Sequence, residues 1–265
     1  MPNRIGTFGM TNSVAIVTGA SSGIGEATAI RLAQDFSAVV VAARGGENLK
    51  RVAEEIRAAG AEALPLELDL AEAAAADTAV NETLKTFGQI DALLNIAGAV
   101  PGIDLFQLSD QQWNTALELK FHGARRLTLR AWDALKASNG AVVFTSGTGA
   151  EQPNAATAAI GTINAAIEAL AKAFSERGLK DGVQVNSVSP GPVMTSRRQG
   201  LIEKAAAANG ISVDTAKAKF LEQAGIARFG EAEEVAELMA FVVSPKARWL
   251  TGTVLRMDGG EIKTV

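Results

Sequence analysis

The sequence predicts an α/β fold of three layers, in which helices cover both faces of a doubly wound parallel sheet. Short apolar runs rich in Val and Ala alternate along the chain with longer segments of helical periodicity. The runs "VAIVT", "AVVVAA" and "AVVFT" are almost continuously hydrophobic, which is typical of strands buried on both faces. Strands that alternate with helices imply right-handed crossovers between parallel neighbours.

The expected elements follow from these patterns in chain order. The strands are expected at Val14–Thr18, Ala38–Ala43, Ala63–Leu68, Ala92–Asn95, Ala141–Thr145, Val183–Val188 and Thr253–Met257. The helical patterns that fill the gaps include Gly25–Gln34, Leu49–Ala59, Ala71–Phe87 and Glu231–Val243. We expect residues 1–12 to form a tail and residues 13–265 a single domain, because neither a repeat nor a linker divides the chain.

Composition narrows the classes of function. The chain is 48% hydrophobic, so it can bury a large core, and its formal net charge of -4 with interspersed signs argues against nucleic acid. It has no cysteine and a single histidine, His122, so disulfides, thiolate metal sites and histidine clusters are excluded and no metal is expected. Signal-peptide and membrane-spanning patterns are not seen. We therefore expect a cytoplasmic protein that binds small molecules and no membrane. Tyrosine is also absent.

A glycine-rich turn joins the first strand to the first helix. In "TGASSGIG", Gly19, Gly23 and Gly25 let the backbone approach a pyrophosphate, which the N-terminus of the next helix attracts through free N–H groups. The turn follows a strand and opens a helix, as a dinucleotide-binding motif requires. The sequence therefore predicts a dinucleotide site made by Gly19, Ser21, Ser22, Gly23, Ile24 and Gly25.

Four segments together carry a family resemblance. "TGASSGIG", "NIAG" at Asn95–Gly98, "SPGPVMT" at Ser189–Thr195 and "LTGTVLRMDGG" at Leu250–Gly260 resemble the short-chain dehydrogenase/reductase family in order and spacing. The resemblance implies a Rossmann-type sheet, a nicotinamide dinucleotide and a homotetramer or homodimer. It also implies that residues 196–225 are a helical insertion that covers the substrate.

The end of the second strand bears on the choice of cofactor. NAD-binding folds place an acidic residue there to hold the ribose hydroxyls. This chain has Ala43 at that place and Arg44 next, and an arginine can hold the 2′-phosphate of NADP. NADP is therefore expected and NAD stays possible, because Glu47 could instead reach the ribose. Arg44 could also be a solvated surface residue.

The resemblance implies further cofactor contacts at three strand ends. Asp69, followed by Leu70, resembles the family's adenine-contacting acid, and Asp69 could also cap the helix expected from Ala71. The remaining positions match the family's segments beside the cofactor and its nicotinamide carboxamide: Asn95, Ala97, Gly98, Pro190, Gly191, Val193 and Thr195.

The family's catalytic set is only partly present. In the family, a tyrosine hydroxyl supplies the proton, a lysine one helical turn later lowers the tyrosine pKa, a serine orients the substrate, and an asparagine on the preceding helix supports the lysine. Ser146 matches the serine, but Ile160 and Asn164 stand at the tyrosine and lysine positions. Lys120 stands at the asparagine position, counted from Trp113 and Gly123. The asparagine and the lysine are thus exchanged between two helices.

This exchange leads to two hypotheses. In the first, Lys120, Ser146 and Asn164 form a rebuilt proton relay, in which burial lowers the pKa of Lys120, and the chain is an NADP-dependent oxidoreductase acting on a small carbonyl or alcohol. In the second, the chain is a regulatory or inactive protein that binds the dinucleotide, and side chains such as Ile160 fill the substrate pocket. Separately, Lys120 could simply point to solvent or to a subunit interface.

Other charged residues near the site have simpler interpretations. His122 is expected on the helix surface or at an interface, and Lys172 on a solvated helix face. Arg197 and Arg198 could meet an acidic substrate, but an exposed hinge is favoured.

Overall fold

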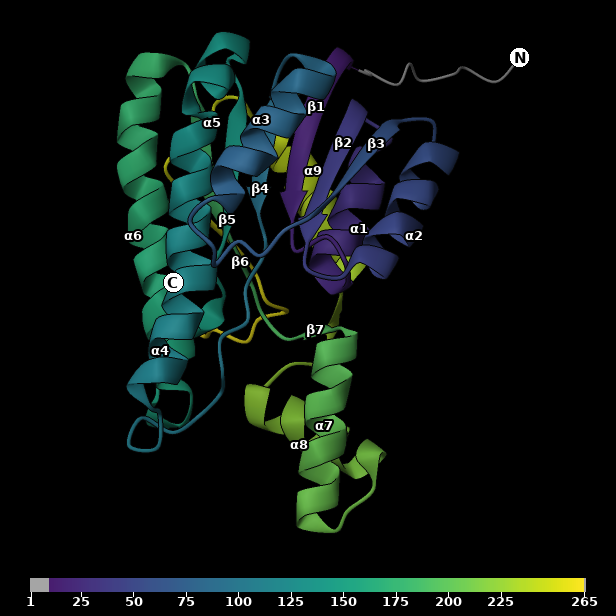
Figure 1. Ribbon diagram of the computed structural model, residues 1–265. Helices are drawn as coiled ribbons and strands as arrows, with labels where there is room; N and C mark the ends of the chain where they lie inside the picture. The colour runs from purple at the N-terminus through teal and green to yellow at the C-terminus, as the bar shows by residue number, and fades with distance from the viewer. Residues whose placement is uncertain (1–9, 265) are drawn as a thin grey trace, which may run out of the picture.

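A single parallel sheet of seven strands organises the structure (Figure 1). The computed structural model describes residues 10–264. The strand order is β3-β2-β1-β4-β5-β6-β9, as a doubly wound α/β fold requires. The strands are β1 (Met10–Thr18), β2 (Phe36–Ala43), β3 (Glu62–Glu67), β4 (Ala92–Asn95), β5 (Ala141–Thr145), β6 (Gln184–Pro190) and β9 (Val254–Met257). All seven expected strands are confirmed, and β4 and β5 match their expected bounds.

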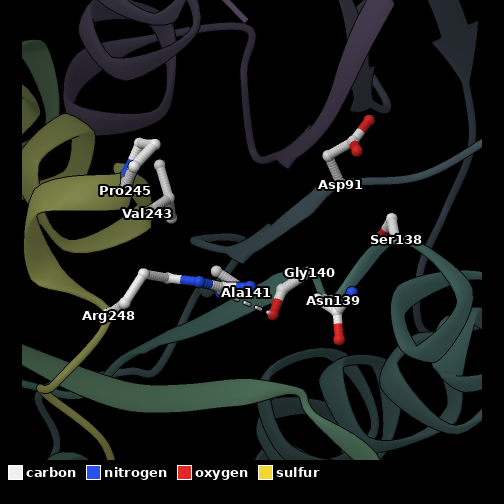
Figure 2. A pocket seen from close by; sticks show the side chains of 8 residues that line it. All are labelled: Asp91, Ser138, Asn139, Gly140, Ala141, Val243, Pro245 and Arg248. Carbon is white, nitrogen blue, oxygen red and sulfur yellow. Dashed lines mark hydrogen bonds between the residues drawn. The ribbon is translucent and has the colours of Figure 1, made fainter.

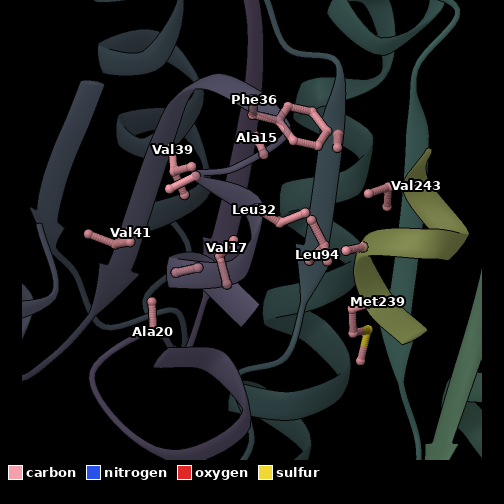
Figure 3. Packing of buried hydrophobic residues seen from close by; sticks show 14 of the residues in the cluster. Ala15, Val17, Ala20, Leu32, Phe36, Val39, Val41, Leu94, Met239 and Val243 are labelled. Atoms are coloured by element: carbon pink, nitrogen blue, oxygen red, sulfur yellow. The ribbon is translucent and has the colours of Figure 1, made fainter. Parts of the chain in front are cut away.

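Helices cover both faces of the sheet, in the three layers that the sequence predicts. One face packs against α1 (Gly23–Leu32), α2 (Gly46–Ala58) and α9 (Ala232–Val243). The other packs against α3 (Ala75–Phe87), α5 (Ala124–Ser138) and α6 (Ala158–Asp181). Figure 3 shows the first of these layers, where Leu32, Phe36 and Met239 meet the Val and Ala side chains of the central strands. Burial of both faces explains why these strands read as nearly continuous hydrophobic runs.

The remaining elements lie around the carboxyl ends of the strands or connect the layers. They are α4 (Asp110–Ala116), a π-helix (Leu117–Gly123), 3₁₀ turns at Thr148–Ala150, Ala155–Thr157 and Pro245–Ala247, β7 (Val193–Met194), β8 (Gly230–Glu231), α7 (Ser196–Asn209) and α8 (Val213–Ala224). The helices α7 and α8 project away from the sheet (Figure 1), and none of the α8 side chains is buried. Within residues 10–264, none of the helices has the length and apolarity that crossing a membrane requires.

Three expectations about local structure were wrong. Met10–Asn12 belong to β1 and not to a tail, with Asn12 at φ +64°; residues 1–9 of that expected tail lie outside the described part. The third helix begins at Ala75 and not at Ala71, because residues 68–74 form turns. The segment around Lys120 is a π-helix rather than α-helix, a departure that frequently marks functional sites. The short β7 and β8 pair was not expected.

Candidate active site

The glycine turn that is predicted to bind phosphate follows β1, at the place in the sheet where the chain crosses from β3 at one edge back to β4, on the other side of β1. Gly19 has φ +67°, and its N–H donates to Ala42 O at 2.8 Å. A Cβ at Gly25 would lie only 2.2 Å from Gly19 O, so the turn closes on the helix at a distance that only glycine permits. Ser22, the N-cap of α1, makes no side-chain cap hydrogen bond. The first N–H groups of α1 are therefore oriented to receive an anion.

A strand-end threonine connects this turn to the next segment of the site. Thr18 Oγ1 accepts hydrogen bonds from the N–H groups of Ile96 at 2.9 Å and Ala97 at 3.0 Å. A Cβ at Gly19 would lie 2.9 Å from Ala97 Cα, so the two backbones touch. Asn95, which is buried, donates from Nδ2 to Thr128 Oγ1 at 3.1 Å. Sequence reasoning missed Thr18, although a hydroxyl at a strand end directly before the glycine turn was a usable signal.

The acid and the arginine expected near the adenosine lie beside each other. Arg44 Nη1 and Asp69 Oδ2 are 3.8 Å apart, and the Arg44 side chain is 65% exposed, so its guanidinium remains open to a further anion. Asp69 Oδ1 accepts from Ala71 N at 3.0 Å, so Asp69 stabilises a turn rather than capping α3. Glu47 is exposed, and its Oε1 lies 3.3 Å from Lys50 Nζ. Leu70 is buried, and its carbonyl packs against Gly123 of the π-helix.

The loop after β6 lies beside the glycine turn between β1 and α1. A Cβ at Gly23 would lie 3.1 Å from Thr195 Cγ2, which places Thr195 opposite the glycine turn. Thr195 also accepts from Arg198 N at 3.3 Å and so caps α7. Earlier in the loop, Pro190 ends β6, and Gly191 N donates to Met257 O at 3.0 Å. Val193 is buried and begins the short pair of β7 with β8.

The three residues expected to carry the chemistry meet at the end of β5. Lys120 Nζ donates to Asn164 Oδ1 at 2.5 Å and to the backbone carbonyl of Ser146 at 3.2 Å. Asn164 Nδ2 lies 3.5 Å from Gly147 O, and a Cβ at Gly147 would come within 2.9 Å of that nitrogen. A Cβ at Gly98 would lie 3.0 Å from Lys120 Cδ. Two glycines thus make room for the Lys120–Asn164 contact.

Burial makes the Lys120 ammonium more acidic than usual. Although the residue keeps some exposed surface, its ammonium lies among protein atoms, and this desolvation lowers its pKa to about 8. The positive charge of Arg197 lowers the pKa further, and the negative charge of Glu168 raises it. An amine with a pKa near neutral can exchange a proton under physiological conditions.

The other residues singled out by sequence lie at the margin of this group. Ile160 is partly buried, and Cβ atoms at Gly149 and Gly102 would lie 3.4 and 3.8 Å from its side chain. His122 packs edge-on against Phe121 and is half-buried; its Nδ1 is buried and has no hydrogen-bond partner within residues 10–264. The His122 side chain is therefore less exposed than the expected position on the helix surface implies. Lys172 is exposed.

Three charged residues near the group, Arg197, Arg198 and Glu168, were not assigned to it from the sequence. Arg197 donates to Val100 O at 2.7 Å and to Gly98 O at 3.4 Å, so it fastens the start of α7 to the loop after β4. Arg198 is half-buried, with its guanidinium 4.9 Å from the centre of the Phe220 ring. Arg198 is therefore less exposed than the favoured interpretation of a solvent-exposed hinge expected, whereas Arg197 is exposed as expected but is held by these two backbone contacts. Glu168 lies one helical turn after Asn164, a spacing that could have revealed it.

A cavity at the amino ends of the strands is separate from this group. Figure 2 shows Arg248 reaching toward Gly140, to whose carbonyl it donates at 3.2 Å. Asp91 and Gly140 directly precede β4 and β5, so the cavity opens at the amino ends of the strands. Within residues 10–264, no group of three or more His, Cys, Asp or Glu side chains is placed to hold a metal ion.

Comparison with known proteins gives consistent matches over nearly the whole chain. A family model described as enoyl-(acyl carrier protein) reductase matches residues 19–261. The short-chain reductase protein NovJ of Streptomyces niveus is 32% identical over 248 residues, which are 94% of this chain and 93% of NovJ. The 3-oxoacyl-[acyl-carrier-protein] reductase FabG of Staphylococcus aureus is 29% identical over 95% of this chain and 98% of its own. The L-sorbose reductase of Gluconobacter frateurii, solved with NADPH and L-sorbose, superposes with a TM-score of 0.93 at 27% identity and covers 98% of this chain and all of that one. The chain therefore belongs to the short-chain dehydrogenase/reductase family of enzymes.

Proposed function

We propose that this protein is an NADP-dependent reductase of small carbonyl compounds in which Lys120 supplies the proton. The observation that carries the proposal is the contact of Lys120 Nζ with Asn164 Oδ1 and Ser146 O, 2.5 and 3.2 Å away. In this proposal Ile160 and Asn164 stand where the family has its tyrosine and lysine, and the chain has no tyrosine at all. The Lys120 side chain enters from the other helix and brings an ammonium to the end of β5.

The residues present fit a nicotinamide dinucleotide. The glycine turn and the free N–H groups of α1 suit a pyrophosphate, and the exposed Arg44 suits a 2′-phosphate. The L-sorbose reductase of similar structure was solved with NADPH. Bound NADPH would supply the hydride that passes to the carbonyl carbon of the substrate. Asn95, Ala97, Gly98, Pro190, Gly191, Val193 and Thr195 form the walls of this proposed site.

The chain's own residues handle the substrate oxygen and its proton. Ser146 is buried at the end of β5 and would donate a hydrogen bond to the carbonyl oxygen, which fixes the substrate. Lys120 would hold the proton at Nζ, and its lowered pKa makes that proton easier to release as charge grows on the oxygen. Asn164 Oδ1 would hold the ammonium in place. In the alternative function, the protein binds the dinucleotide but Ile160 occupies the substrate's place.

One experiment separates the two functions. Purified protein is mixed with NADPH and a panel of small ketones, aldehydes and ketoacyl thioesters, and the loss of NADPH absorbance is followed. Binding of NADPH is measured in parallel by its fluorescence. Turnover of a substrate supports the reductase, whereas tight binding without turnover of the whole panel supports the inactive dinucleotide-binding protein.

Arg44→Ala is expected to weaken NADPH binding roughly tenfold and to leave NADH binding within about twofold. The reason is that only NADPH carries the phosphate that the guanidinium would hold. Equilibrium titrations with both nucleotides check this, with Lys50→Ala as a control from a nearby exposed cation. Equal weakening for both nucleotides would show that Arg44 does not select the phosphate.

Gly25→Ala is expected to remove measurable NADPH binding, because its Cβ would lie 2.2 Å from Gly19 O and push the phosphate turn open. Gly200→Ala is the matched control, since nothing lies within 4 Å of a Cβ there. Nucleotide titration and thermal unfolding of both variants are compared. Undiminished NADPH binding by Gly25→Ala would exclude this turn as the phosphate site.

The domain organisation and the oligomeric state also follow from the proposed function. We infer that residues 10–264 form one domain and that residues 196–225, which contain α7 and α8, cover the substrate. Exposed apolar side chains such as Leu129, Leu179 and Trp249 are consistent with a homodimer or homotetramer.

A further inference from the structure

The carboxyl group of Glu168, which is partly buried, lies next to the proposed catalytic group and is not one of its members. Glu168 follows Asn164 by one turn of α6, so both side chains are on the same helix face. Its Oε1 is buried and has no hydrogen-bond partner in the described part of the chain. An unpartnered carboxylate oxygen is costly to bury, so this position favours the neutral carboxyl.

The neighbour through which Glu168 can act is Ser146. Glu168 lies one turn after Asn164, whose side chain reaches the carbonyl of Gly147, the residue next to Ser146. Hydrogen bonding with the Ser146 hydroxyl lowers the pKa of Glu168. The same hydroxyl lies 3.4 Å from Val188 O, which is too long for a strong hydrogen bond. The Ser146 hydrogen is therefore not committed to the backbone and can turn toward either the Glu168 carboxylate or a substrate oxygen.

The surroundings of Glu168 raise its pKa on balance. Desolvation raises its pKa most, the negative charge of Glu151 raises it further, and the positive charge of Lys120 opposes both. Glu168 also lines a cavity of about 520 Å³, together with Glu151, Val254 and Arg256. Glu151 and Arg256 pair at 2.5 Å and are each 31% exposed, so water can reach this cavity. Glu168 therefore lines a cavity that water can enter.

We propose that Glu168 is a positioning residue whose proton decides whether the Ser146 hydroxyl offers its hydrogen to the substrate oxygen. A neutral Glu168 donates to Ser146 Oγ, and the serine hydrogen is then free to point at the substrate. An ionised Glu168 accepts the serine hydrogen and draws it away from the substrate. The cavity beside Arg256 is the route by which Glu168 exchanges its proton with water. This inference rests on the proposed reductase function.

The pH profile of carbonyl reduction tests the proposal. For the wild-type enzyme, kcat/KM is expected to fall in two steps as pH rises, first with ionisation of Glu168 and then near pH 8 with that of Lys120. The first step is on the order of 10²-fold, the usual cost of losing one hydrogen-bond donor to a reacting oxygen. Glu168→Gln keeps a neutral side chain that can donate at every pH, so only the step near pH 8 should remain. Glu176→Gln, an exposed change on the same helix, should keep both steps.

A second measurement needs no turnover. The carboxyl titration of Glu168 is taken from infrared difference spectra between the wild type and Glu168→Gln, and then from the same pair in a Ser146→Ala background. Loss of the serine hydrogen bond should raise the pKa of Glu168. An unchanged pKa, or a Glu168→Gln profile that keeps both steps, would overturn the proposal. Absence of any wild-type turnover would instead refute the reductase function, and the infrared result would still decide whether Ser146 and Glu168 are coupled.

Discussion

Lys120→Ala is expected to lower kcat for carbonyl reduction by roughly 10²- to 10⁴-fold, the usual contribution of a positioned general acid. The ammonium that Asn164 and the Ser146 carbonyl hold is the proton donor in the proposed mechanism. NADPH binding should weaken by less than about tenfold, because one hydrogen-bonding group is lost while the phosphate turn is untouched. Steady-state kinetics and nucleotide titration of the same preparation separate the two effects.

The pH dependence of wild-type turnover is an independent test of Lys120 as the proton donor. A proton donor must be protonated to act, so reduction should be fastest below the pKa of Lys120, about 8, and should slow as pH rises through it. Oxidation of the alcohol product needs the neutral amine and should show the opposite trend. Lys180→Ala, an exposed change on α6, is the control. Turnover by Lys120→Ala at the wild-type rate would remove Lys120 from the mechanism.

The sequence predicts the architecture well because the hydrophobic pattern of each strand and helix is carried by many residues. Burial of β1, β2 and β5 on both faces requires apolar residues at nearly every position, and these runs are what the pattern detects. The errors fall where few residues decide the structure. The helix α3 begins at Ala75 and not at Ala71, because Asp69 stabilises a turn before it. The sequence could not decide this, since an Asp at that position suits a turn as well as a helix cap.

The candidate site was predictable only in part. The assignment of Lys120 and Asn164 to the site came from matching two helices to the family's catalytic positions, and the structure brings the two side chains into contact. The π-helix at Leu117–Gly123 could not be foreseen, because an i to i+5 bonding pattern leaves no mark in hydrophobic periodicity. Arg197 binds carbonyls that lie about a hundred positions earlier in the chain, and local sequence carries no information on such a contact.

Exchanging the two residues gives the sharpest test of their contact. Asn164→Lys alone is expected to lower the free energy of unfolding by about 2–4 kcal/mol, because a second ammonium would then face Lys120 where an amide oxygen now lies 2.5 Å away. One of the two lysines would lose its proton to relieve this repulsion. Lys120→Asn alone should fold but lose most of its activity, since the proton donor is gone.

The double variant Lys120→Asn with Asn164→Lys should recover much of what the single changes lose. It restores one ammonium facing one amide, and the absence of side chains at Gly98 and Gly147 leaves room on both sides of the contact. The two changes should therefore be non-additive in stability by at least about 1 kcal/mol, as residues in direct contact usually are. Chemical denaturation of the four proteins measures this coupling, and kcat of each shows whether a lysine from α6 can reach the same reacting oxygen. Additive losses in both quantities would mean that the ammonium and the amide act separately, and the exchange between the two helices would then have no functional meaning.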